Sequence, residues 1–528
     1  MLNLKYKNIL LLSFVILFSM AQAQAKGQLN SYHVKEIQLD VINAPREEKD
    51  IKYIKEKYLG KNLSHVELMA VNEDLVKYFW QEDGYIASQI TINEQDLKTS
   101  GTLKIIVEPG VLRDVVLFND TPDNKLIDEY INKIISQKPI TNKHIQKYIS
   151  LMNRIPGYYV DYEFRKTDNK STFDLVLKVS KLKGEIYTSI DSYGSTETGQ
   201  MENSVFGKLY SKDGGSDAIS FSGFTSNYPD RLYGISLGYI KPINSLGTNA
   251  SITASHSENN SSRYDPDPVP NSNGINSSLR GALNHLIYTD EKQNLTAEFG
   301  TNYKYSKDFT LDVNNSNEDN TKDTYVSADL NLSYSITDKL NAYNNASFTA
   351  TQGVSGTYKN YTDPTDTTDK HFNWVQLDLT RDQPLSHDFS LFSRICGAHS
   401  DSDLPSSEQF AMGGRDFGRG YDSALLVGNK MLAGSLEIRY NKYFDDNQWL
   451  QSLQPYIFRD TGYIGKQDSG TNITHLSSYG AGLRINLNYG INIESEVAQP
   501  MKKNYNIDDS PYTSTTVYSA MISKSFSF

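Results

Sequence analysis

The sequence predicts a transmembrane β-barrel of about sixteen antiparallel strands that follows two small α+β domains. Three observations lead to this fold class. The residues after about position 185 alternate weakly between apolar and polar side chains, and polar turns separate the alternating segments. The residues before them repeat one order of strands and helices twice. The chain also begins with the pattern of an export signal.

Residues 1–25 have the parts of a secretory signal peptide. Lys5 and Lys7 give a positive start, and residues 9–20 form an apolar run that is too short to span a bilayer. Small residues follow, so we expect cleavage after Ala23 or Ala25. No later segment approaches the length of a transmembrane helix, so any membrane span is predicted to be a β-strand.

Residues 26–109 are predicted to form the first α+β domain. Ser64 and Glu67 have the spacing of a capping box, in which each residue satisfies the backbone of the other at the start of a helix. That helix places one apolar face together, at Leu68, Val71, Leu75, Tyr78 and Phe79. Strands are expected at 34–41, 86–92 and 102–107.

Residues 110–182 are predicted to repeat the same β-α-α-β-β order as a second domain. Strands are expected at 112–118, 158–165 and 173–179. Two helical faces lie between them, at Leu126, Ile127, Tyr130, Ile131 and Ile134, and at Ile145, Tyr148, Ile149 and Met152. Pro156-Gly157 ends the second helix. Each repeat has roughly 75 residues, which is enough to fold alone.

Residues 183–528 are predicted to form the barrel. In one segment Tyr233, Ile235, Leu237 and Tyr239 alternate with small or polar residues. A soluble sandwich would bury such an apolar face against a second sheet, whereas a barrel would turn it to lipid. A barrel would also point Arg484, Glu494 and Glu496 into a wet lumen.

The connections between strands favour the barrel. Short turns near 211–215, 242–247, 289–294, 337–339 and 382–387 alternate with long polar loops near 256–276, 304–322, 352–370 and 398–430. Outer-membrane barrels have short periplasmic turns and long outer loops. The last strand carries Phe526 and Phe528, and a terminal Phe suits a strand that is handed to the barrel-assembly machinery; an ordinary last strand of a soluble sheet is the alternative.

The loop at 398–430 is predicted to enter the lumen. Gly413, Gly414, Gly418 and Gly420 allow tight folding around Arg419. An arginine in a partly shielded pore needs a carboxylate partner, preferably in bidentate geometry, and Asp460 on a lumen-facing strand is the candidate. A solvated loop arginine and a turn aspartate are the alternatives.

The bulk composition excludes several functions. The formal net charge of −11 argues against a nucleic-acid partner. The single cysteine, Cys396, cannot form an intramolecular disulfide. There is no nucleotide-binding loop, nucleophile elbow or paired catalytic carboxylate pattern, and the nine histidines lack metal-site spacing. We therefore expect no enzymatic activity, no cofactor and no metal.

The whole mature chain resembles the two-partner secretion transporters of the TpsB type, such as FhaC, ShlB and CdiB. Gly84-Tyr85 and 101–110 look like the pattern of the family's POTRA domains, and 151–157 is similar to its second POTRA turn. Residues 191–199 resemble its first barrel hairpin. The sequence Arg419-Gly420-Tyr421 matches the family's loop-tip motif, and Phe458, Asp460 and Gly462 match its inner-wall motif.

The resemblance implies an outer-membrane pore of a Gram-negative bacterium with two POTRA domains in the periplasm. These domains would capture an unfolded, TpsA-like exoprotein, which would leave without nucleotide hydrolysis. Arg419, Gly420, Tyr421, Phe458, Asp460 and Gly462 would attach the loop to the barrel wall. The expected partners are this exoprotein, outer-membrane lipid and lipopolysaccharide, and the barrel-assembly machinery, with the chain itself a monomer.

One feature departs from the relatives, and four other functions stay open. Several relatives have a pore-plugging helix before the first POTRA domain, but the eight to ten residues available here are too few, so we expect none. An assembly factor for outer-membrane proteins shares the plan but typically has more POTRA domains. A diffusion porin lacks POTRA domains, and a plugged solute receptor would carry one large N-terminal plug domain. A surface lipase or protease would need a nucleophile motif.

Overall fold

The computed structural model describes residues 31–528 except 45–46, 119–122, 169–171, 196, 213, 262–270, 312–317, 362–370, 446, 466–472, 502–503, 508–509 and 514. The chain forms two compact units, one of Met1–Val115, Ile135–Asn142 and Phe164–Leu175, and one of Val116–Ile134, Lys143–Glu163 and Val176–Phe528. The predicted signal peptide and the predicted lack of a plug helix fall on residues 1–30, which lie outside the described residues.

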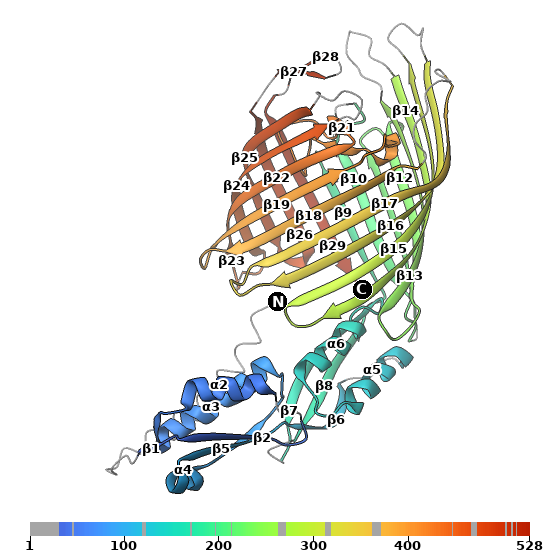
Figure 1. Cartoon of the computed structure of the whole chain (residues 1–528). Helices are drawn as coiled ribbons and strands as arrows, with labels where there is room; N and C mark the ends of the chain where they lie inside the picture. Colours follow the sequence, from blue (N-terminus) through green and yellow to red (C-terminus); the bar gives the residue numbers. More distant parts are fainter. Residues whose placement is uncertain are drawn as a thin grey trace. The chain divides into compact units, whose positions relative to one another are not determined.

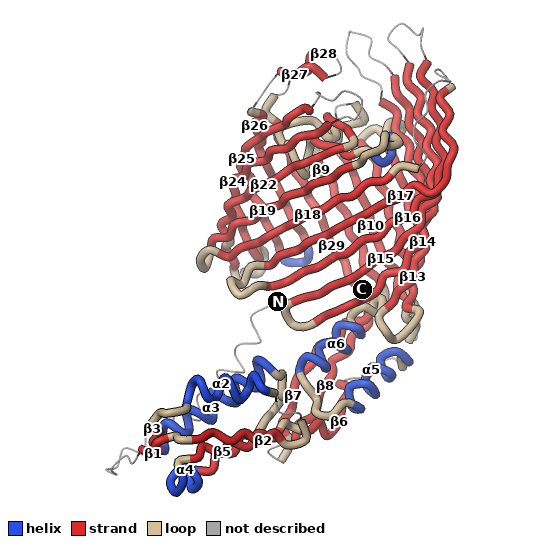
Figure 2. The backbone as a smooth tube through the Cα atoms, in the orientation of Figure 1, coloured by secondary structure: helices blue, strands red, loops and turns tan. Residues whose placement is uncertain are grey.

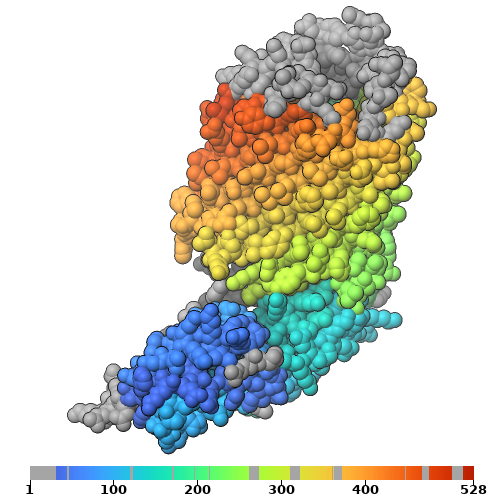
Figure 3. All heavy atoms as spheres, in the orientation of Figure 1, coloured from blue at the N-terminus to red at the C-terminus, as the bar shows by residue number. Residues whose placement is uncertain are grey.

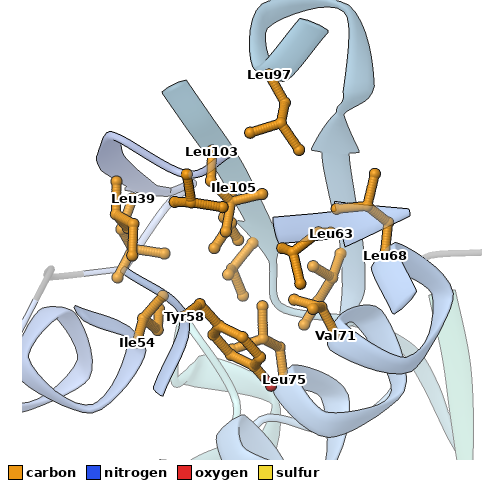
Figure 4. Close-up of a cluster of buried hydrophobic side chains, with 14 of the residues drawn as sticks. Leu39, Ile54, Tyr58, Leu63, Leu68, Val71, Leu75, Leu97, Leu103 and Ile105 are labelled. Carbon is orange, nitrogen blue, oxygen red and sulfur yellow. The ribbon is translucent and has the colours of Figure 1, made fainter. Parts of the chain in front are cut away.

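The first α+β domain is built on a three-stranded sheet in the order β2-β5-β4. Its elements are β1 (Ser31–His33), β2 (Glu36–Val41), α2 (Glu48–Tyr58), β3 (Asn62–Ser64), α3 (His65–Glu82), β4 (Gln89–Asn93), α4 (Glu94–Ser100) and β5 (Thr102–Glu108). β2 runs parallel to β5, and β4 runs antiparallel to it. Figure 4 shows how the apolar side chains of the strands and helices meet in one core that includes Leu39, Leu75 and Ile105.

The predicted capping box at the start of α3 is confirmed. Ser64 Oγ accepts from the backbone N of Glu67 at 3.4 Å, and Glu67 Oε2 accepts from the backbone N of Ser64 at 2.6 Å. Leu68, Val71, Leu75 and Phe79 are buried on the predicted helical face. The start of α3 is therefore set by two local side chains and its orientation by its apolar face.

The expected strand at 86–92 is wrong in its bounds, and a short helix was missed. β4 begins only at Gln89, because Ala87 has a φ of 49° and interrupts the extended backbone. α4 follows at once, capped by Asn93, whose Oδ1 accepts from the backbone N of Gln95 and Asp96. Gly101 ends α4 with a φ of 79°. Asn93 and Gly101 are the sequence features that indicate this helix, since both residue types favour helix ends. Seven residues are too few for the helical period of apolar residues to appear.

The second α+β domain has the predicted β-α-α-β-β order. Its elements are β6 (Val111–Phe118), α5 (Lys125–Ser136), α6 (Asn142–Met152), β7 (Tyr158–Lys166) and β8 (Thr172–Lys181), with the sheet order β6-β8-β7. Both predicted helical faces are buried, through Ile127, Tyr130, Ile134, Ile145, Ile149 and Met152. Arg113 on β6 holds Asp174 on β8 in a bidentate pair at 2.8 and 2.5 Å.

Sixteen strand positions close into an antiparallel barrel in the described part of the chain, which confirms the predicted fold class (Figure 1). The strands are β9 (Gly184–Asp191), β10 (Glu202–Tyr210), β11 (Ala218–Ser226), β12 (Leu232–Pro242), β13 (Thr248–Ser261), β14 (Asn271–Thr289), β15 (Gln293–Leu311), β16 (Glu318–Thr337), β17 (Tyr343–Asn360), β18 (Asn373–Pro384), β19 (Phe389–His399), β22 (Lys430–Tyr440) with its short extension β23 (Lys442–Tyr443), β24 (Leu450–Gly465), β25 (Ile473–Leu487), β26 (Ile491–Pro500) and β29 (Val517–Ser527). β29 pairs with β9 and so closes the ring.

The barrel wall has the predicted two faces. Ile235 and Leu237 are each 61% exposed on the outside. Figure 3 shows a continuous outer surface on the face of the barrel toward the viewer, where the residues are coloured from yellow-green to orange-red. On the inside, Arg280 pairs with Asp329 at 2.5 Å and with Glu298 at 2.7 Å across β14, β15 and β16. Figure 2 shows that the barrel wall consists of strands, and helix in the described barrel residues is limited to two turns of three residues each.

Three of the expected long loops are partly strands. β14 to β17 have 18 to 20 residues each, and β14 pairs with β15 up to Asn271 and Leu311. They project beyond the neighbouring strands at one side of the rim (Figure 1). Outside a membrane both faces of a strand meet water, so pairing continues while the apolar alternation that marks a membrane strand disappears. This loss of alternation made residues 304–311 and 352–360 read as loops.

Candidate functional site

The loop between β19 and β22 returns into the barrel and carries the predicted motif. It contains the helical turn η1 (Ser406–Glu408) and the short paired strands β20 (Phe410–Met412) and β21 (Leu426–Gly428). Between β20 and β21 lies the tip, residues 413–421. The backbone N of Gly413 donates to the carbonyl of Phe417, and that of Gly414 to the carbonyl of Tyr421, so the tip is a closed turn.

β24 supplies the wall opposite the tip, and its side chains alternate between the lumen and the outside from Tyr456 to Ile464. Phe458, Asp460 and Gly462 face the lumen, where Asp460 is 0% exposed. The residues between them face outward, as Ile457 and Tyr463 show with exposures of 58% and 49%. All three members of the predicted inner-wall motif thus lie on one face because the side-chain period of a strand is two.

Arg419 and Asp460 are in bidentate contact. Arg419 Nε donates to Asp460 Oδ2 at 2.9 Å, and Nη2 donates to Oδ1 at 2.8 Å. The backbone N of Arg419 also donates to Oδ2, at 3.2 Å. The fork of a guanidinium matches the two oxygens of a carboxylate, so this geometry fixes both the position and the direction of the loop tip.

Two further carboxylates meet Arg419, and sequence analysis did not assign them this contact. Arg419 Nη1 donates to Glu437 Oε1 on β22 and to Glu496 Oε2 on β26, each at 2.9 Å. Nη2 also donates to Ser435 Oγ at 3.0 Å. Glu496 was expected in the lumen from the alternation of its strand, but alternation gives the face of a residue and not its partner across the barrel.

Phe458 completes the surroundings of the guanidinium. The Cζ atom of Arg419 lies 3.5 Å from the centroid of the Phe458 ring. A weakly hydrated guanidinium stacks favourably on an aromatic face when water is excluded. Every hydrogen-bonding edge of Arg419 therefore meets an oxygen, and one of its faces meets a ring.

Gly420 and Tyr421 bring the tip against the wall. A Cβ atom at Gly420 would lie 2.7 Å from the backbone N of Pro500 and 2.9 Å from the carbonyl carbon of Gln499, so a side chain there would collide with β26. Tyr421 is 1% exposed, and its hydroxyl donates to the carbonyl of Ser477 at 3.0 Å. Gly420 permits the tip to lie close to β26, and Tyr421 attaches the tip to β25.

Gly462 gives space to the loop from the wall side. A Cβ atom there would lie 2.4 Å from Met412 Sδ and 3.0 Å from the Cβ of Ala433. Met412 belongs to a buried cluster in which loop residues Phe417, Tyr421 and Leu426 pack against wall residues Ile464 and Leu476. All six residues predicted to attach the loop are therefore placed at one junction of loop and wall.

A network of opposite charges surrounds this junction. Arg439 Nε donates to Glu437 Oε2 at 2.7 Å, and Arg484 bridges Glu437 and Glu494 at 3.1 and 2.9 Å. Arg415 of the tip lies 3.5 Å from Glu494, and Asp416 pairs with Arg394 at 3.0 Å. These groups line a polar cavity of about 250 Å³. Each acid of the junction has a basic neighbour, which offsets the cost of removing these charges from bulk water.

Phe526 and Phe528 lie at the seam of the barrel. Both are exposed, and the backbone N and O of Phe528 pair with Gly184 at 3.0 Å each. The last residue of the chain therefore pairs with the first residue of β9.

The described residues contain neither a candidate metal site nor a membrane-spanning helix. Among them, no group of three or more His, Cys, Asp or Glu side chains is placed to hold a metal ion. None of the described helices has the length and apolar character needed to cross a membrane.

Comparison with known proteins gives a consistent result. The family described as haemolysin secretion/activation protein ShlB/FhaC/HecB matches residues 169–485, and the ShlB-type POTRA domain matches residues 32–110. No curated protein sequence matches. Among solved structures, CdiB from Escherichia coli has 16% identity and a TM-score of 0.69, covering 96% of this chain and 92% of its own.

Two other solved structures have the same fold. CdiB from Acinetobacter baumannii has 17% identity and a TM-score of 0.63, covering 98% of both chains. BamA from Haemophilus ducreyi, lacking POTRA domains 1–3, has 14% identity and a TM-score of 0.51, covering 94% of this chain and 100% of its own. At these identities the likeness concerns the fold.

Proposed function

Since this chain belongs to the haemolysin secretion/activation family ShlB/FhaC/HecB, we propose that it captures an unfolded secreted protein with its POTRA domains and passes it through the barrel. The family consists of outer-membrane transporters of two-partner secretion, not of enzymes, and each serves a cognate secreted protein. The finer steps below, from capture to release, are our proposal for this chain.

The observation that carries the proposal is the loop held in the lumen by Arg419. We define the Arg419 lock as Arg419 with Asp460, Glu437 and Glu496. The guanidinium is 7% exposed as part of its residue and has three carboxylates within 2.9 Å. A loop held this firmly blocks free diffusion, so the resting barrel is closed and its opening is coupled to the arrival of a substrate.

Capture is proposed to occur on α3 of the first POTRA domain. Its outer face carries apolar side chains at helical spacing that remain 37 to 56% exposed, although the opposite face is buried. We call these residues the α3 stripe: Val66, Met69, Val76 and Trp80. An exposed apolar stripe on a helix whose core face is already satisfied indicates a binding surface.

The edge of the sheet beside the stripe offers backbone groups. β4 is at the edge of the order β2-β5-β4, and Val76, Gln89 and Ile90 help to line a cleft of about 470 Å³ next to it. Asn72 Nδ2 donates to the carbonyl of Ile90 at 2.7 Å. An incoming extended chain would take the place of the Asn72 amide at the carbonyl of Ile90 and add a strand to the edge of the sheet. Binding of this kind recognises the backbone of the partner and therefore tolerates many sequences.

Export is proposed to need no nucleotide. The captured chain would enter the barrel, displace the tip from the Arg419 lock and fold outside, where folding prevents its return. The other proposed partners are outer-membrane lipid and lipopolysaccharide around the barrel and the barrel-assembly machinery that would recognise Phe526 and Phe528. We propose that the transporter acts as a monomer because the barrel is closed by a single chain.

The test compares culture supernatants and surface proteins of a deletion strain with those of a strain complemented by this chain. We expect one or a few large polypeptides to disappear in the deletion and return on complementation, while other outer-membrane barrels stay unchanged. A simultaneous fall of many barrels would instead establish an assembly factor. Unchanged proteins with slower entry of solutes would establish a porin.

A further inference from the structure

A second buried charged side chain of the inserted loop, after Arg419, lies away from the tip on η1. Glu408 is 8% exposed, and its oxygens accept from side chains on three barrel strands. Tyr325 on β16 donates its hydroxyl to Oε1 at 2.7 Å, and Trp374 on β18 donates Nε1 to Oε2 at 2.9 Å. Lys304 on β15 forms an ion pair with Oε1.

Apolar packing and hydroxyl groups reinforce this contact. Phe410 packs its ring edge against Trp374 with centroids 5.7 Å apart, within a buried cluster that also contains Leu404, Tyr325 and Phe372. Ser407 Oγ lies 2.8 Å from the hydroxyl of Tyr325, and Ser406 Oγ donates to Asp308 Oδ2 at 2.8 Å. The carboxylate is thus held by charged and neutral donors in a site from which water is largely excluded.

This contact shares no hydrogen-bonding partner with the Arg419 lock among the described residues. Glu408 is bound by β15, β16 and β18, whereas Arg419 is bound by β22, β24 and β26. Met431 is a neighbour of both apolar clusters, so packing is continuous while the polar contacts are separate. Substitutions at sites that share no partner usually have additive effects on stability.

We propose that Glu408 is a positioning residue that anchors the ascending limb of the loop, residues 404–410, independently of the tip. When the Arg419 lock opens, the tip at 413–421 moves while the limb stays on β15, β16 and β18. The loop then acts as a hinged arm whose free part is the tip. This inference deepens the proposed function, since it rests on release of the Arg419 lock during transport.

A carboxylate anchor suits this role because it is costly to break from either side. Removing Glu408 leaves the ammonium of Lys304 beside the ring of Tyr325 without its carboxylate, and removing Trp374 Nε1 leaves one carboxylate oxygen short of a donor. Hydrogen bonds to charged groups contribute about 1.5–3 kcal/mol, which corresponds to about a ten- to hundredfold change in local opening.

The test is hydrogen exchange, followed by mass spectrometry, on the full chain in lipid nanodiscs without substrate. Peptides from the limb and from the tip are read separately. Arg419→Met is expected to accelerate exchange about a hundred- to several-thousandfold at 413–421 and to leave 404–410 unchanged. Glu408→Ala is expected to accelerate exchange about ten- to hundredfold at 404–410 and to leave 413–421 unchanged. Trp374→Phe, which keeps the ring but removes the donor, is expected to give a smaller effect in the limb alone.

Matched controls separate this hinge from general loosening. Asp401→Asn changes a carboxylate of the same loop whose side chain is 79% exposed, and it is expected to alter neither peptide. Equal acceleration of limb and tip by Arg419→Met would overturn the hinge, as would an unchanged limb in both Glu408→Ala and Trp374→Phe. Because no substrate is present, the outcome is independent of the secretion assay, which tests the proposed function separately.

Discussion

Arg419 and Asp460 are 41 residues apart in the chain, yet they form a bidentate pair at 2.8 and 2.9 Å inside the barrel. The pair joins an outer loop to the middle of the wall. Glu437 and Glu496 bind the same guanidinium. Arg419 therefore takes part in all three of these carboxylate contacts, whereas each acid takes part in only one of the three. The two partners of the pair are therefore unequal.

This inequality predicts that Arg419→Met loosens the tip more than Asp460→Asn. Loss of the arginine leaves three carboxylates without its charge and is expected to cost about 3–5 kcal/mol of tip anchoring. Asp460→Asn keeps an acceptor and leaves Glu437 and Glu496 in place, so about 1–3 kcal/mol is expected. Single-channel recordings in planar bilayers should show longer and more frequent openings in that order.

The same order has two internal checks. Arg419→Lys keeps the charge but loses the fork, so its openings are expected to fall between those of the wild type and Arg419→Met. The double variant Arg419→Met with Asp460→Asn is expected to open less than the sum of the single effects, because one removes the partner of the other. Equal effects of Arg419→Met and Asp460→Asn would contradict the shared-arginine account.

A second prediction concerns Gly420 of the tip, which lies against β26, and Gly462 of β24, which lies against Met412 of the loop. Gly420→Ala would press on the backbone of β26, which cannot move aside, so tip displacement costing about 1–3 kcal/mol is expected. Gly462→Ala would mainly press on the flexible end of Met412, and a smaller effect is expected. Tip exchange rates and channel openings measure both.

The substitution Met412→Ala, added to each glycine variant, distinguishes the collision at Gly462 from the collision at Gly420. Met412→Ala removes the sulfur 2.4 Å from the added Cβ and is expected to restore the closed channel of Gly462→Ala. The same substitution is expected to leave Gly420→Ala open. If Gly420→Ala closed as firmly as the wild type, the proposed close seat of the tip on β26 would be wrong.

The sequence indicates the faces of the wall well and the partners across it poorly. Period-2 alternation was enough to put Phe458, Asp460 and Gly462 on one face, since that requires only local geometry. The contact of Arg419 with Glu437 and Glu496 depends on how strands 18 and 77 residues away in sequence close into a ring. Such a contact has no local signal.

Two other misses have physical causes of their own. Residues 304–311 were expected in a loop but continue β15, because strand pairing persists beyond the membrane while apolar alternation does not. The sequence does not indicate the burial of Glu408, because a lone glutamate in a polar loop usually lies in water. Only the ring of donors from Lys304, Tyr325 and Trp374 distinguishes it, and those donors come from three separate strands.

A third prediction concerns the pH dependence of the first POTRA domain through Asp74. Burial opposes its charge, but hydrogen bonds from Lys57, Tyr58 and Tyr53 outweigh burial and lower the pKa of Asp74. A lowered folded-state pKa stabilises the domain above the unfolded value of about 3.9, and this stability is lost as pH falls through the folded-state pKa. Asp74→Asn should therefore destabilise the domain at about pH 7 and match the wild type in strong acid.

Asp50 provides the contrast of opposite sign. Burial, then the charge of Asp83, raises the pKa of Asp50, although Tyr78 donates a hydrogen bond to it at 3.0 Å. A raised folded-state pKa gives stability that is present at low pH and lost as pH rises, so Asp50→Asn is expected to be neutral or stabilising at about pH 7. The circular dichroism signal of the helices in the full chain measures both variants during denaturation.

A fourth prediction tests capture on the α3 stripe. Met69→Ser and Val76→Ser replace side chains that are 56% and 37% exposed, so the domain core is expected to keep its stability. Each loses about 1 kcal/mol of apolar burial against a bound chain, and the double variant is expected to lower secretion about thirtyfold. The measurement is the amount of partner in the medium relative to the amount of transporter in the outer membrane.

The matched control for the stripe is Tyr159→Ser in the second α+β domain, which removes an apolar side chain that is 60% exposed on β7. It is expected to leave secretion unchanged. The helical circular dichroism signal of each variant excludes unfolding as the cause of any loss. Normal secretion by the stable Met69→Ser, Val76→Ser chain would remove α3 as the capture surface, whereas equal losses in Tyr159→Ser would show that capture depends on exposed apolar area in general and not on this helix.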